Sequence, residues 1–381
     1  RHRHDNNTET TQCGGGGGAA ANGGELESIK VYCRVRPLGK ATGDDVNSGE
    51  SIKVSGDGQL VIDKANTNYH GNAAFNFDAT FGPETKNTAV YEACGANVVQ
   101  GCIEGYNGTI FCYGTTGAGK THTMEGTPAE PGVIPSAFKQ VFDHVQRVTA
   151  GGVGVAGAAV GAGVEASTEA LDEAGPSTQI LVRCTYCELY NEAIRDLLST
   201  EPSKSLNDSI SKGGIKSLES SLASFVVEDV EACTRLLISG KERRTVRSTN
   251  MNAASSRSHT IFTMVIETAD QAAGEPGQPP PPPLIKAGKL NLVDLAGSER
   301  ISQTGTTGAG MLEATKINGS LSVLGRVIGG LAEGSKAHIP WRESKLTLLL
   351  KDSLGGNTRT AMVANLSPSR ICVEDSIATL R

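Results

Sequence analysis

The residues with the clearest chemical meaning form a short glycine-rich run that ends in a lysine and a threonine. The segment GTTGAGKT matches the pattern G-x-x-x-x-G-K-[ST] and follows the strand-like run TIFCY. Such glycines let successive backbone N–H groups turn toward a phosphate, and the following helix adds the positive end of its dipole. Lys120 is suited to the β- and γ-phosphates of a nucleotide, and the Thr121 hydroxyl to Mg²⁺. The predicted phosphate-binding residues are Gly114, Thr115, Thr116, Gly117, Ala118, Gly119, Lys120 and Thr121.

An acidic residue that would complete such a site lies downstream. Asp294 ends the apolar run that begins at Lys289, where P-loop enzymes keep a carboxylate that holds Mg²⁺ through water. The main-chain N–H of Gly297 is placed to sense the terminal phosphate. An Asp that caps a turn after a strand is a common alternative for Asp294. No Asn in the sequence is followed by Lys, so the guanine-reading pattern N-K-x-D is missing and ATP or ADP is the expected nucleotide.

Alternating strand and helix patterns surround these residues. The runs IKVYCRV, TIFCYG, ILVRCTYCELY, HTIFTMVIET and KLNLVDLAG are short and β-rich, and several are continuously apolar, as buried strands are. The segments VEDVEACTRLLISGKERR, INGSLSVLGRVIGGLA and WRESKLTLLLKDSL carry apolar residues at helical spacing. The alternation predicts an α/β fold: a single P-loop domain with a central mixed, mostly parallel β-sheet flanked by helices on both faces.

Three segments of biased composition interrupt this pattern. Residues 1–24 are predicted to be a flexible Gly-rich leader ahead of one domain at 25–381. A Gly- and Ala-rich loop insertion is expected at about 150–178. The Pro-rich run ADQAAGEPGQPPPPP marks a further insertion at about 269–287, between two adjacent strands, which favours a hairpin over a domain linker.

Composition disfavours several kinds of protein. The formal net charge of −6 argues against nucleic-acid binding through bulk positive charge, and without a run of about 18 apolar residues no membrane insertion is expected. Nine cysteines and no signal-peptide pattern indicate a reducing cytoplasm. Cys184 and Cys187 form a C-x-x-C pair inside a strand-like run, where an offset of three residues places the two thiols on opposite faces. A metal or redox pair is therefore not expected there.

Five blocks of sequence, taken in order, resemble a known family. They are RVRP at 34–37, GTTGAGKTHTMEG from Gly114, SSRSH at 255–259, DLAGSER at 294–300, and HIPWRESKLT with LKDSLGGNTRT after it. Together they resemble a kinesin motor domain, and the resemblance runs from about Leu26 to Arg381. The segments EATKIN, NGTIFCYG and GVIPSAF are most similar to the kinesin-2 group. The resemblance implies a microtubule-stimulated ATPase that converts Mg-ATP hydrolysis into movement along microtubules.

The resemblance also implies roles for residues around the nucleotide. Arg34, Pro37 and His122 would flank the adenine, a flat cation and a ring lying against the base, and Arg36 belongs to the same nucleotide-binding set. An ordinary charge at a strand end is the alternative for Arg34.

Two loops are expected to close over the γ-phosphate, a first closing loop at 255–258 and a second closing loop at 294–299. In the first, Ser256 would complete Mg²⁺ coordination and Ser255 would help to hold the attacking water. In the second, Glu299 would pair with Arg257 on closure, and a surface ion pair of negligible energy is the alternative. The implied catalytic set is Ser255, Ser256, Arg257, Gly297 and Glu299. The implied metal set is Thr121, Ser256 and, through water, Asp294.

Tubulin's acidic surface implies a basic surface on this chain. Residues 314–360 carry seven Lys and Arg against three Asp and Glu, a net charge of 7 − 3 = +4. A solvated helix face is the alternative explanation. The implied microtubule contacts are Lys316, Lys336, His338, Arg342 and Lys345.

Some positions depart from the family pattern. Gly308 to Glu313 replaces a basic segment, Leu348 stands in place of Arg, Gly319 replaces a helix-favouring residue, and Thr115 stands where Gln is usual. These departures leave a second function open, a weakly active nucleotide-dependent tubulin-binding subunit of a heterodimeric motor. Dimerisation through regions outside this chain, a cytoplasmic microtubule location, and plus-end-directed transport in cilia or flagella are further expectations.

Overall fold

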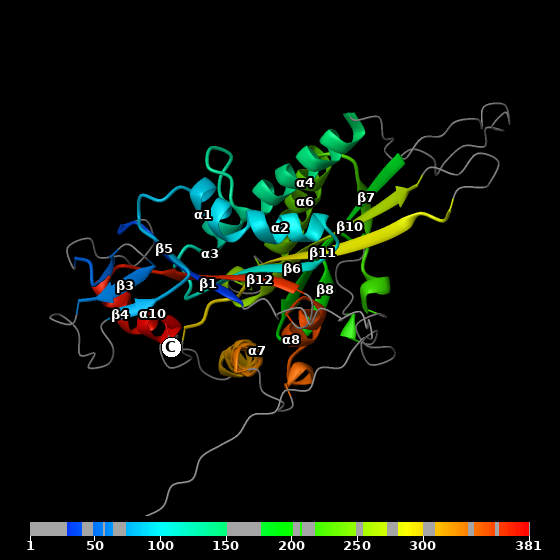
Figure 1. Ribbon diagram of the computed structural model, residues 1–381. Helices are drawn as coiled ribbons and strands as arrows, with labels where there is room; N and C mark the ends of the chain where they lie inside the picture. The colour runs from blue at the N-terminus through cyan, green and yellow to red at the C-terminus, as the bar shows by residue number, and fades with distance from the viewer. Residues whose placement is uncertain are drawn as a thin grey trace, which may run out of the picture.

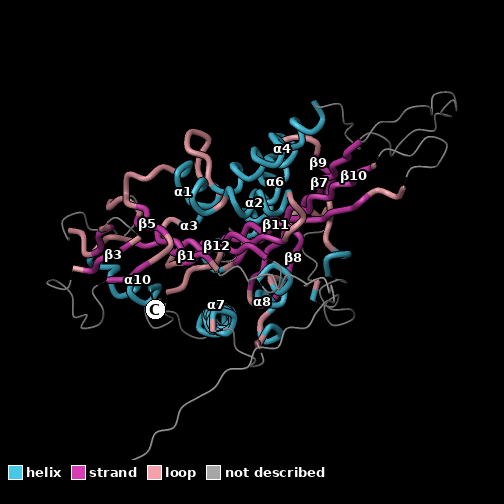
Figure 2. Tube along the Cα trace, in the orientation of Figure 1, coloured by secondary structure: helices cyan, strands magenta, loops and turns pink. Residues whose placement is uncertain are grey.

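The computed structural model describes residues 29–39, 49–55, 58–63, 74–150, 177–200, 206–207, 218–248, 254–272, 281–299, 309–333, 339–354 and 358–380. Figure 1 shows a central twisted sheet with helices on both of its faces, and Figure 2 shows the same three layers. The predicted leader at 1–24 lies outside the described residues, as do Lys336 and His338 and most of the predicted loop at 150–178.

Among the described residues, nine strands form the main sheet, in the order β5-β1-β12-β6-β11-β10-β7-β8, with β9 paired to β7. Their bounds are β1 Lys30–Val35, β5 Ala79–Phe81, β6 Asn107–Tyr113, β7 Ser177–Tyr190, β8 Ala193–Asp196, β9 Phe225–Val227, β10 His259–Gln271, β11 Leu284–Asp294 and β12 Thr358–Leu366. The strands from β5 to β11 are parallel neighbours, whereas β10 is antiparallel to both β11 and β7, and β8 and β9 are antiparallel to β7. Because β10 is antiparallel to both of its neighbours, β7 runs in the same direction as β11, and six of the nine strands therefore share one direction. The predicted mixed, mostly parallel sheet is confirmed.

The hairpin of β10 and β11 extends further than its sequence suggested. The two strands pair antiparallel from Thr260 with Asp294 to Asp270 with Leu284. At the far end Asp270 accepts hydrogen bonds from Thr178 at 3.0 Å and from Lys286 at 3.0 Å, which ties β7, β10 and β11 together. Both strands therefore continue into the segment 269–287 that was expected to be an insertion, because cross-strand polar pairs stabilise the ladder there.

One face of the sheet is covered by α1 Asn87–Cys94, α2 Ala96–Ile103, α4 Val133–Ala150 and α6 Val230–Ser248 (Figure 1). In α4 the buried residues recur at helical spacing, for example Ile134, Ala137, Phe138 and Val141. They join Phe262 of the sheet in the largest hydrophobic cluster, so this face forms the main core.

The opposite face carries α7 Ala309–Ala332, α8 Lys345–Leu349, α9 Lys351–Leu354 and α10 Val373–Leu380. The segment 341–354, whose spacing is helical, is divided into a 3₁₀ turn at Trp341–Glu343 followed by α8 and α9. The division occurs at Ser344, which has an extended backbone and whose hydroxyl accepts a hydrogen bond from the N–H of Leu346 at 3.1 Å. Ser344 thus caps a new helix where one continuous helix is expected from the pattern.

A small antiparallel sheet of β2 Ile52–Val54, β3 Gln59–Ile62 and β4 Ala74–Asn76 lies beside this arrangement. It shares a third hydrophobic cluster with α10 and β1. The two thiols of the C-x-x-C pair lie on opposite faces of the sheet, as predicted, since Cys184 packs in the main core and Cys187 in the cluster on the opposite face. No helix among the described residues has the length and apolar character needed to cross a bilayer.

Candidate nucleotide-binding site

The phosphate-binding pattern forms the connection between β6, in the middle of the sheet, and α3 Lys120–Met124. Gly114 has φ 145° and Gly119 has φ 101°, both in the region that favours glycine. A Cβ on Gly114 would lie 2.3 Å from the carbonyl oxygen of Asn365. Two of the glycines are therefore required by the backbone path itself, which brings the loop against the end of β12.

Lys120 is held at the base of this loop. Its side chain is only 8% exposed, and Nζ donates hydrogen bonds to the carbonyl oxygens of Gly114 and Thr115, both at 2.9 Å. Burial lowers the pKa of Lys120, while Asp294 and Glu299 act in the opposite direction. The ammonium group is thus positioned in a dry part of the loop, where an incoming anion gains most from it.

Thr121 and Asp294 form the site that fits Mg²⁺. The Thr121 hydroxyl donates to Asp294 Oδ2 at 2.7 Å. Asp294 Oδ1 is buried and has no hydrogen-bond partner among the described residues. A buried carboxylate oxygen of this kind needs a partner, and hydroxyl and carboxylate oxygens are the ligands that Mg²⁺ prefers. The donor set therefore fits the metal that the sequence implied.

The segments predicted to close over the γ-phosphate contact each other and the loop. The N–H of Gly297 donates to the carbonyl oxygen of Ser256 at 2.9 Å, and the N–H of Ser298 donates to that of Gly114 at 3.1 Å. The Gly297 N–H that was expected to face a phosphate is therefore bonded to the first closing loop. The side chain of Ser255 lies outside the described residues.

Glu299 has a partner that the sequence did not predict. Its carboxylate accepts from the backbone N–H of Thr116 at 2.9 Å and from the Thr116 hydroxyl at 2.6 Å. Thr116 offers two donors close together, which suits the two oxygens of a carboxylate. The pairing of Glu299 with Arg257 stays a prediction.

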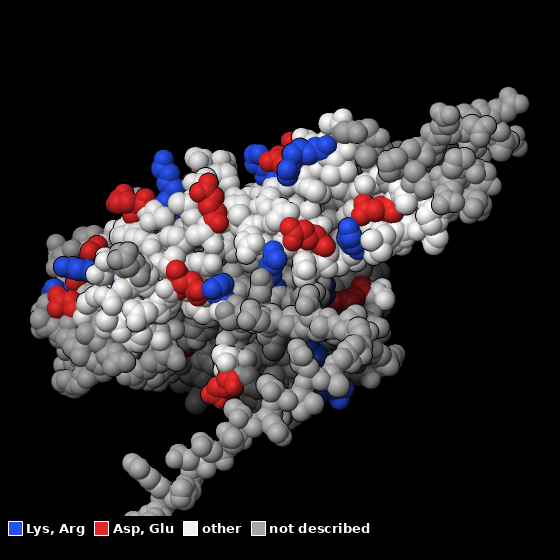
Figure 3. Space-filling view, viewed as in Figure 1, with Lys and Arg blue, Asp and Glu red and all other residues white. Residues whose placement is uncertain are grey.

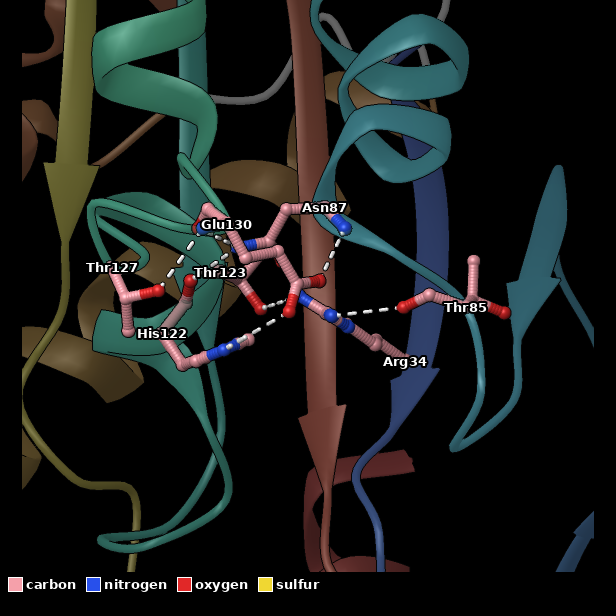
Figure 4. Close-up of polar contacts among 7 residues, drawn as sticks. All are labelled: Arg34, Thr85, Asn87, His122, Thr123, Thr127 and Glu130. Atoms are coloured by element: carbon pink, nitrogen blue, oxygen red, sulfur yellow. Dashed lines mark hydrogen bonds and ion pairs between the residues drawn. The ribbon is translucent and has the colours of Figure 1, made fainter.

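The side of the pocket that carries Arg34 contains a network of buried and partly buried hydrogen bonds (Figure 4). Arg34 is 8% exposed, and its guanidinium donates to Asn87 Oδ1 at 2.5 Å, to Thr123 Oγ1 at 2.9 Å and to the carbonyl oxygen of Thr85 at 3.1 Å. Asn87 in turn donates from Nδ2 to the carbonyl oxygens of His122 and Glu130, both at 3.1 Å. Arg34 therefore joins the wall of the pocket to β1. Its direct role at the base stays a prediction.

A pocket of about 1030 Å³ brings most of the predicted residues together. Its lining includes twelve of them, namely Arg34, Arg36, Pro37, Thr116, Gly117, Ala118, Gly119, Lys120, Thr121, His122, Ser256 and Asp294. Gly114, Thr115, Gly297 and Glu299 do not line the pocket but contact it through the hydrogen bonds described above. Arg36 is fixed by a bond from Nε to the carbonyl oxygen of Gly117 at 2.7 Å.

Sequence reasoning missed the contribution of α6. Lys241 forms an ion pair with Glu125 at 2.6 Å, at the end of α3, and both line the pocket. Arg244 contacts Glu188 at 3.5 Å and donates to the Ser258 hydroxyl at 3.1 Å, beside the first closing loop. The basic cluster KERR at 241–244 was the available signal, but the helical pattern gave no reason to direct it at the nucleotide.

The residues predicted to contact microtubules differ in how exposed they are and in whether they are already bonded. Lys316 on α7 and Arg342 before α8 are exposed. Lys345 is half-buried, with Nζ donating to the carbonyl oxygen of Glu192 at 2.7 Å and its backbone N–H to Glu192 Oε2 at 3.0 Å. Arg326, which was counted in the same basic stretch, forms an ion pair with Glu343.

Arg359, also counted in that stretch, points elsewhere. Its guanidinium lies 5.2 Å from the ring centroid of Tyr106 and donates to the carbonyl oxygen of Asn97 on α2 at 3.2 Å. The net charge of +4 counted along 314–360 therefore does not belong to one surface. On the face seen in Figure 3, acidic and basic side chains are interspersed.

Comparisons with known proteins agree with this architecture. The family model described as "Kinesin motor domain" matches residues 34–381. The kinesin-like protein klp-20 of Caenorhabditis elegans is 38% identical over 359 residues, which are 93% of this chain and 49% of that protein, so the chain spans about half the length of this relative. A solved structure titled "Structure of a fast kinesin: Implications for ATPase mechanism and interactions with microtubules" is 33% identical with a TM-score of 0.70, and the match covers 93% of this chain and 89% of that one. The chain belongs to the kinesin motor domain family, whose members are P-loop ATPases that act on microtubules.

Proposed function

We propose that this chain is a microtubule-stimulated ATPase domain that hydrolyses Mg-ATP and converts the hydrolysis into movement along microtubules. The arrangement around Asp294 carries the proposal: Oδ2 accepts from Thr121, and the buried Oδ1 has no hydrogen-bond partner among the described residues. Lys120 lies in the same pocket. A nucleotide with Mg²⁺ is the ligand whose charges complement this set.

The chain's own groups divide the work, because phosphoryl transfer needs positioning and charge neutralisation more than a strong base. Lys120 exchanges the carbonyl oxygens of Gly114 and Thr115 for phosphate oxygens. Thr121, Ser256 and, through water, Asp294 would hold Mg²⁺, which would neutralise charge on the transferred phosphoryl group. Ser255 helps to hold the attacking water.

Glu299 alternates between two partners in this proposal. With Thr116 it occupies two donors of the phosphate loop. When the terminal phosphate engages the loop, Glu299 leaves Thr116 and pairs with Arg257, while the Gly297 N–H leaves the carbonyl oxygen of Ser256. The new pair shields the γ-phosphate from bulk water while the attacking water stays held beside it, so the exchange of partners is a step that sets turnover.

The microtubule contact is assigned to the outer face of α7 and α8. Lys316 and Arg342 support it, because both are exposed there. Lys336 and His338 complete the proposed set, and Lys345 contributes after release from Glu192. The sequence likeness to the kinesin-2 group motivates the finer proposals of dimerisation, a cytoplasmic microtubule location and plus-end-directed transport in cilia.

A second candidate function is a weakly active tubulin-binding subunit of a heterodimeric motor. Two contacts on the outer face favour it, because each engages a basic side chain. They are the hydrogen bond from Lys345 to Glu192 and the ion pair of Arg326 with Glu343. Leu348 on α8 adds to this, since an apolar residue supplies no charge toward an acidic surface.

ATP turnover measured with and without microtubules tests the proposal. We expect clear stimulation in the unaltered chain. We expect Glu299→Ala to bind ATP but to hydrolyse it about 100-fold more slowly, in the range lost with a group that positions the proton transfer. Glu92→Ala, an exposed glutamate on α1, is the matched control and should behave like the unaltered chain. Microtubule binding without stimulation would favour the second candidate, and normal turnover of Glu299→Ala would remove Glu299 from the mechanism.

A further inference from the structure

A buried histidine stands between the closing loops and α7. His259 begins β10, directly after the first closing loop, and is 2% exposed. Its Nδ1 accepts a hydrogen bond from the backbone N–H of Ala296 at 3.0 Å, and its Nε2 lies 3.0 Å from Ser320 Oγ on α7. The Ser320 hydroxyl donates to the carbonyl oxygen of Ile317 at 2.6 Å. The imidazole thus contacts the second closing loop and α7 at once.

These contacts fix the tautomer. A backbone N–H can only donate, so Nδ1 must be unprotonated to accept from Ala296. The ring proton then resides on Nε2 and donates to Ser320, whose own proton goes to Ile317. Every donor in the chain from Ala296 to Ile317 meets an acceptor, and a buried chain of this kind keeps its geometry because each unmade bond is costly.

Burial keeps the ring neutral, and two neighbouring positive charges add to this effect. Burial lowers the pKa of His259 to about 3, and the neighbouring Lys120 and Arg244 act in the same direction. Lys120 belongs to the phosphate loop, and Arg244 bonds Ser258 of the first closing loop. The ring is therefore surrounded by elements of the nucleotide site. With this lowered pKa it stays neutral at neutral pH.

The position of Ala296 shows which two parts of the molecule this chain of hydrogen bonds connects. It lies between Asp294 and Gly297, on the loop that must move when Glu299 changes its partner. On the other side, Ser320 lies one turn from Lys316 along α7. A second polar contact between α7 and this loop is a bond from Asn318 Nδ2 to the carbonyl oxygen of Glu299 at 3.2 Å.

We propose that His259 is a positioning residue that couples the backbone of the second closing loop to α7, through its paired contacts with Ala296 and Ser320. A shift of Ala296 moves or breaks the chain and so biases the position of α7, and a load on α7 acts back on the loop. This inference rests on the proposed function. It assigns to His259 no contact with nucleotide and no part in the bond-breaking step.

Ser320→Ala is the first test, because it removes the acceptor for Nε2 and leaves the nucleotide pocket unaltered. We expect basal turnover to stay within about twofold and microtubule stimulation to fall at least about fivefold, the lower end of ordinary coupling between sites. His259→Asn should reproduce the loss, since its Oδ1 can accept from Ala296 but the shorter side chain does not reach Ser320. Ser376→Ala is the matched control: that hydroxyl is equally buried in α10 and bonds the carbonyl oxygen of Ser367 at 3.1 Å.

A readout without microtubules separates this inference from the proposed function. Hydrogen exchange of the α7 amides is compared in ADP and in a non-hydrolysable ATP analogue. We expect a nucleotide-dependent difference in the unaltered chain and in Ser376→Ala, and its loss in folded Ser320→Ala, as checked by thermal melting. A full response in Ser320→Ala, or none in the unaltered chain, overturns the coupling role. Absence of microtubule stimulation in the unaltered chain with this exchange pattern retained overturns the proposed function instead.

Discussion

In the nucleotide pocket, Lys120 is buried and bonded by two carbonyl oxygens of its own loop, whereas on the outer face of α7 and α8 Lys316 and Arg342 are exposed. The pocket collects its groups from segments that are far apart in sequence. Thr116 and Glu299, for example, are separated by 183 positions. The outer face is built from one stretch of chain. Two of its basic side chains are already bonded, Lys345 to Glu192 and Arg326 to Glu343.

The difference reflects what each region must do. A phosphate-transfer site gains from fixed, dehydrated groups, because electrostatic interactions are strong where water is excluded. A docking surface for a charged partner works through several weak, solvent-screened contacts. Single substitutions should therefore have large effects in the pocket and small effects on the outer face.

The largest expected effect is in the pocket. Lys120→Ala should weaken ATP and ADP binding by about 1.5 to 3 kcal/mol, because it removes a charge-assisted contact. Titration of a fluorescent nucleotide analogue measures this. Lys139→Ala, which removes an exposed lysine on α4, should leave the affinity unchanged. Equal affinity in the two variants would contradict the phosphate-loop assignment.

The buried histidine predicts a pH dependence of stability. The folded-state pKa of His259 is about 3 against an ordinary value of 6.5, so between these values the unfolded chain binds more protons than the folded one. The contribution of His259 to the free energy of unfolding is complete above pH 6.5 and declines, by up to about 1.4 kcal/mol per pH unit, as the pH falls toward 3.

Denaturant unfolding of the unaltered chain and of His259→Asn between pH 7.5 and 5, a range of roughly two and a half units around the ordinary pKa, measures this term. The unaltered chain should lose stability more steeply than the variant. Identical slopes would show that the ring takes up its proton in the folded protein as readily as in the unfolded chain, and so that its surroundings are not as dry as its burial indicates.

A smaller effect is expected within α7. Gly319 lies inside this helix, and a Cβ there would meet no atom within 4 Å. Gly319→Ala should stabilise the protein by about 0.5 to 1 kcal/mol through helix propensity alone, without changing nucleotide affinity. Thermal melting and nucleotide titration check both parts. Destabilisation would mean that the outer side of α7 is under a packing constraint like that of the pocket.

The smallest effects should come from the exposed cations. Arg342→Ala is expected to weaken microtubule binding by about 0.2 to 1 kcal/mol, and more at low salt than at high salt. Lys345→Ala should weaken binding less, because its ammonium group already bonds the Glu192 carbonyl oxygen. Cosedimentation with microtubules at several salt concentrations measures both. A larger loss for Lys345→Ala would show that Glu192 releases this lysine on binding.

Several features of the site were predictable from sequence because they depend on neighbours in the chain. GTTGAGKT after an apolar strand predicts the loop, since its glycines serve a backbone path with positive φ. Asp294 and Thr121, which the sequence assigned to the same Mg²⁺ site, are hydrogen-bonded, because the buried parallel strands β11 and β6 end at one edge of the sheet. The broken helix at Ser344 was not predicted, since a helical apolar pattern does not register a competing cap.

The sequence by itself determined the loop, the strand and helix types, and the family. Only the tertiary structure decided that Glu299 contacts Thr116, that Arg34 is enclosed by Asn87, Thr123 and Thr85, and that Arg359 faces α2. It also decided that His259 joins Ala296 to Ser320. The physical reason is that local patterns follow from the covalent chain and its periodicity, whereas partners across the fold are selected by strand order and by the need to satisfy each buried polar group.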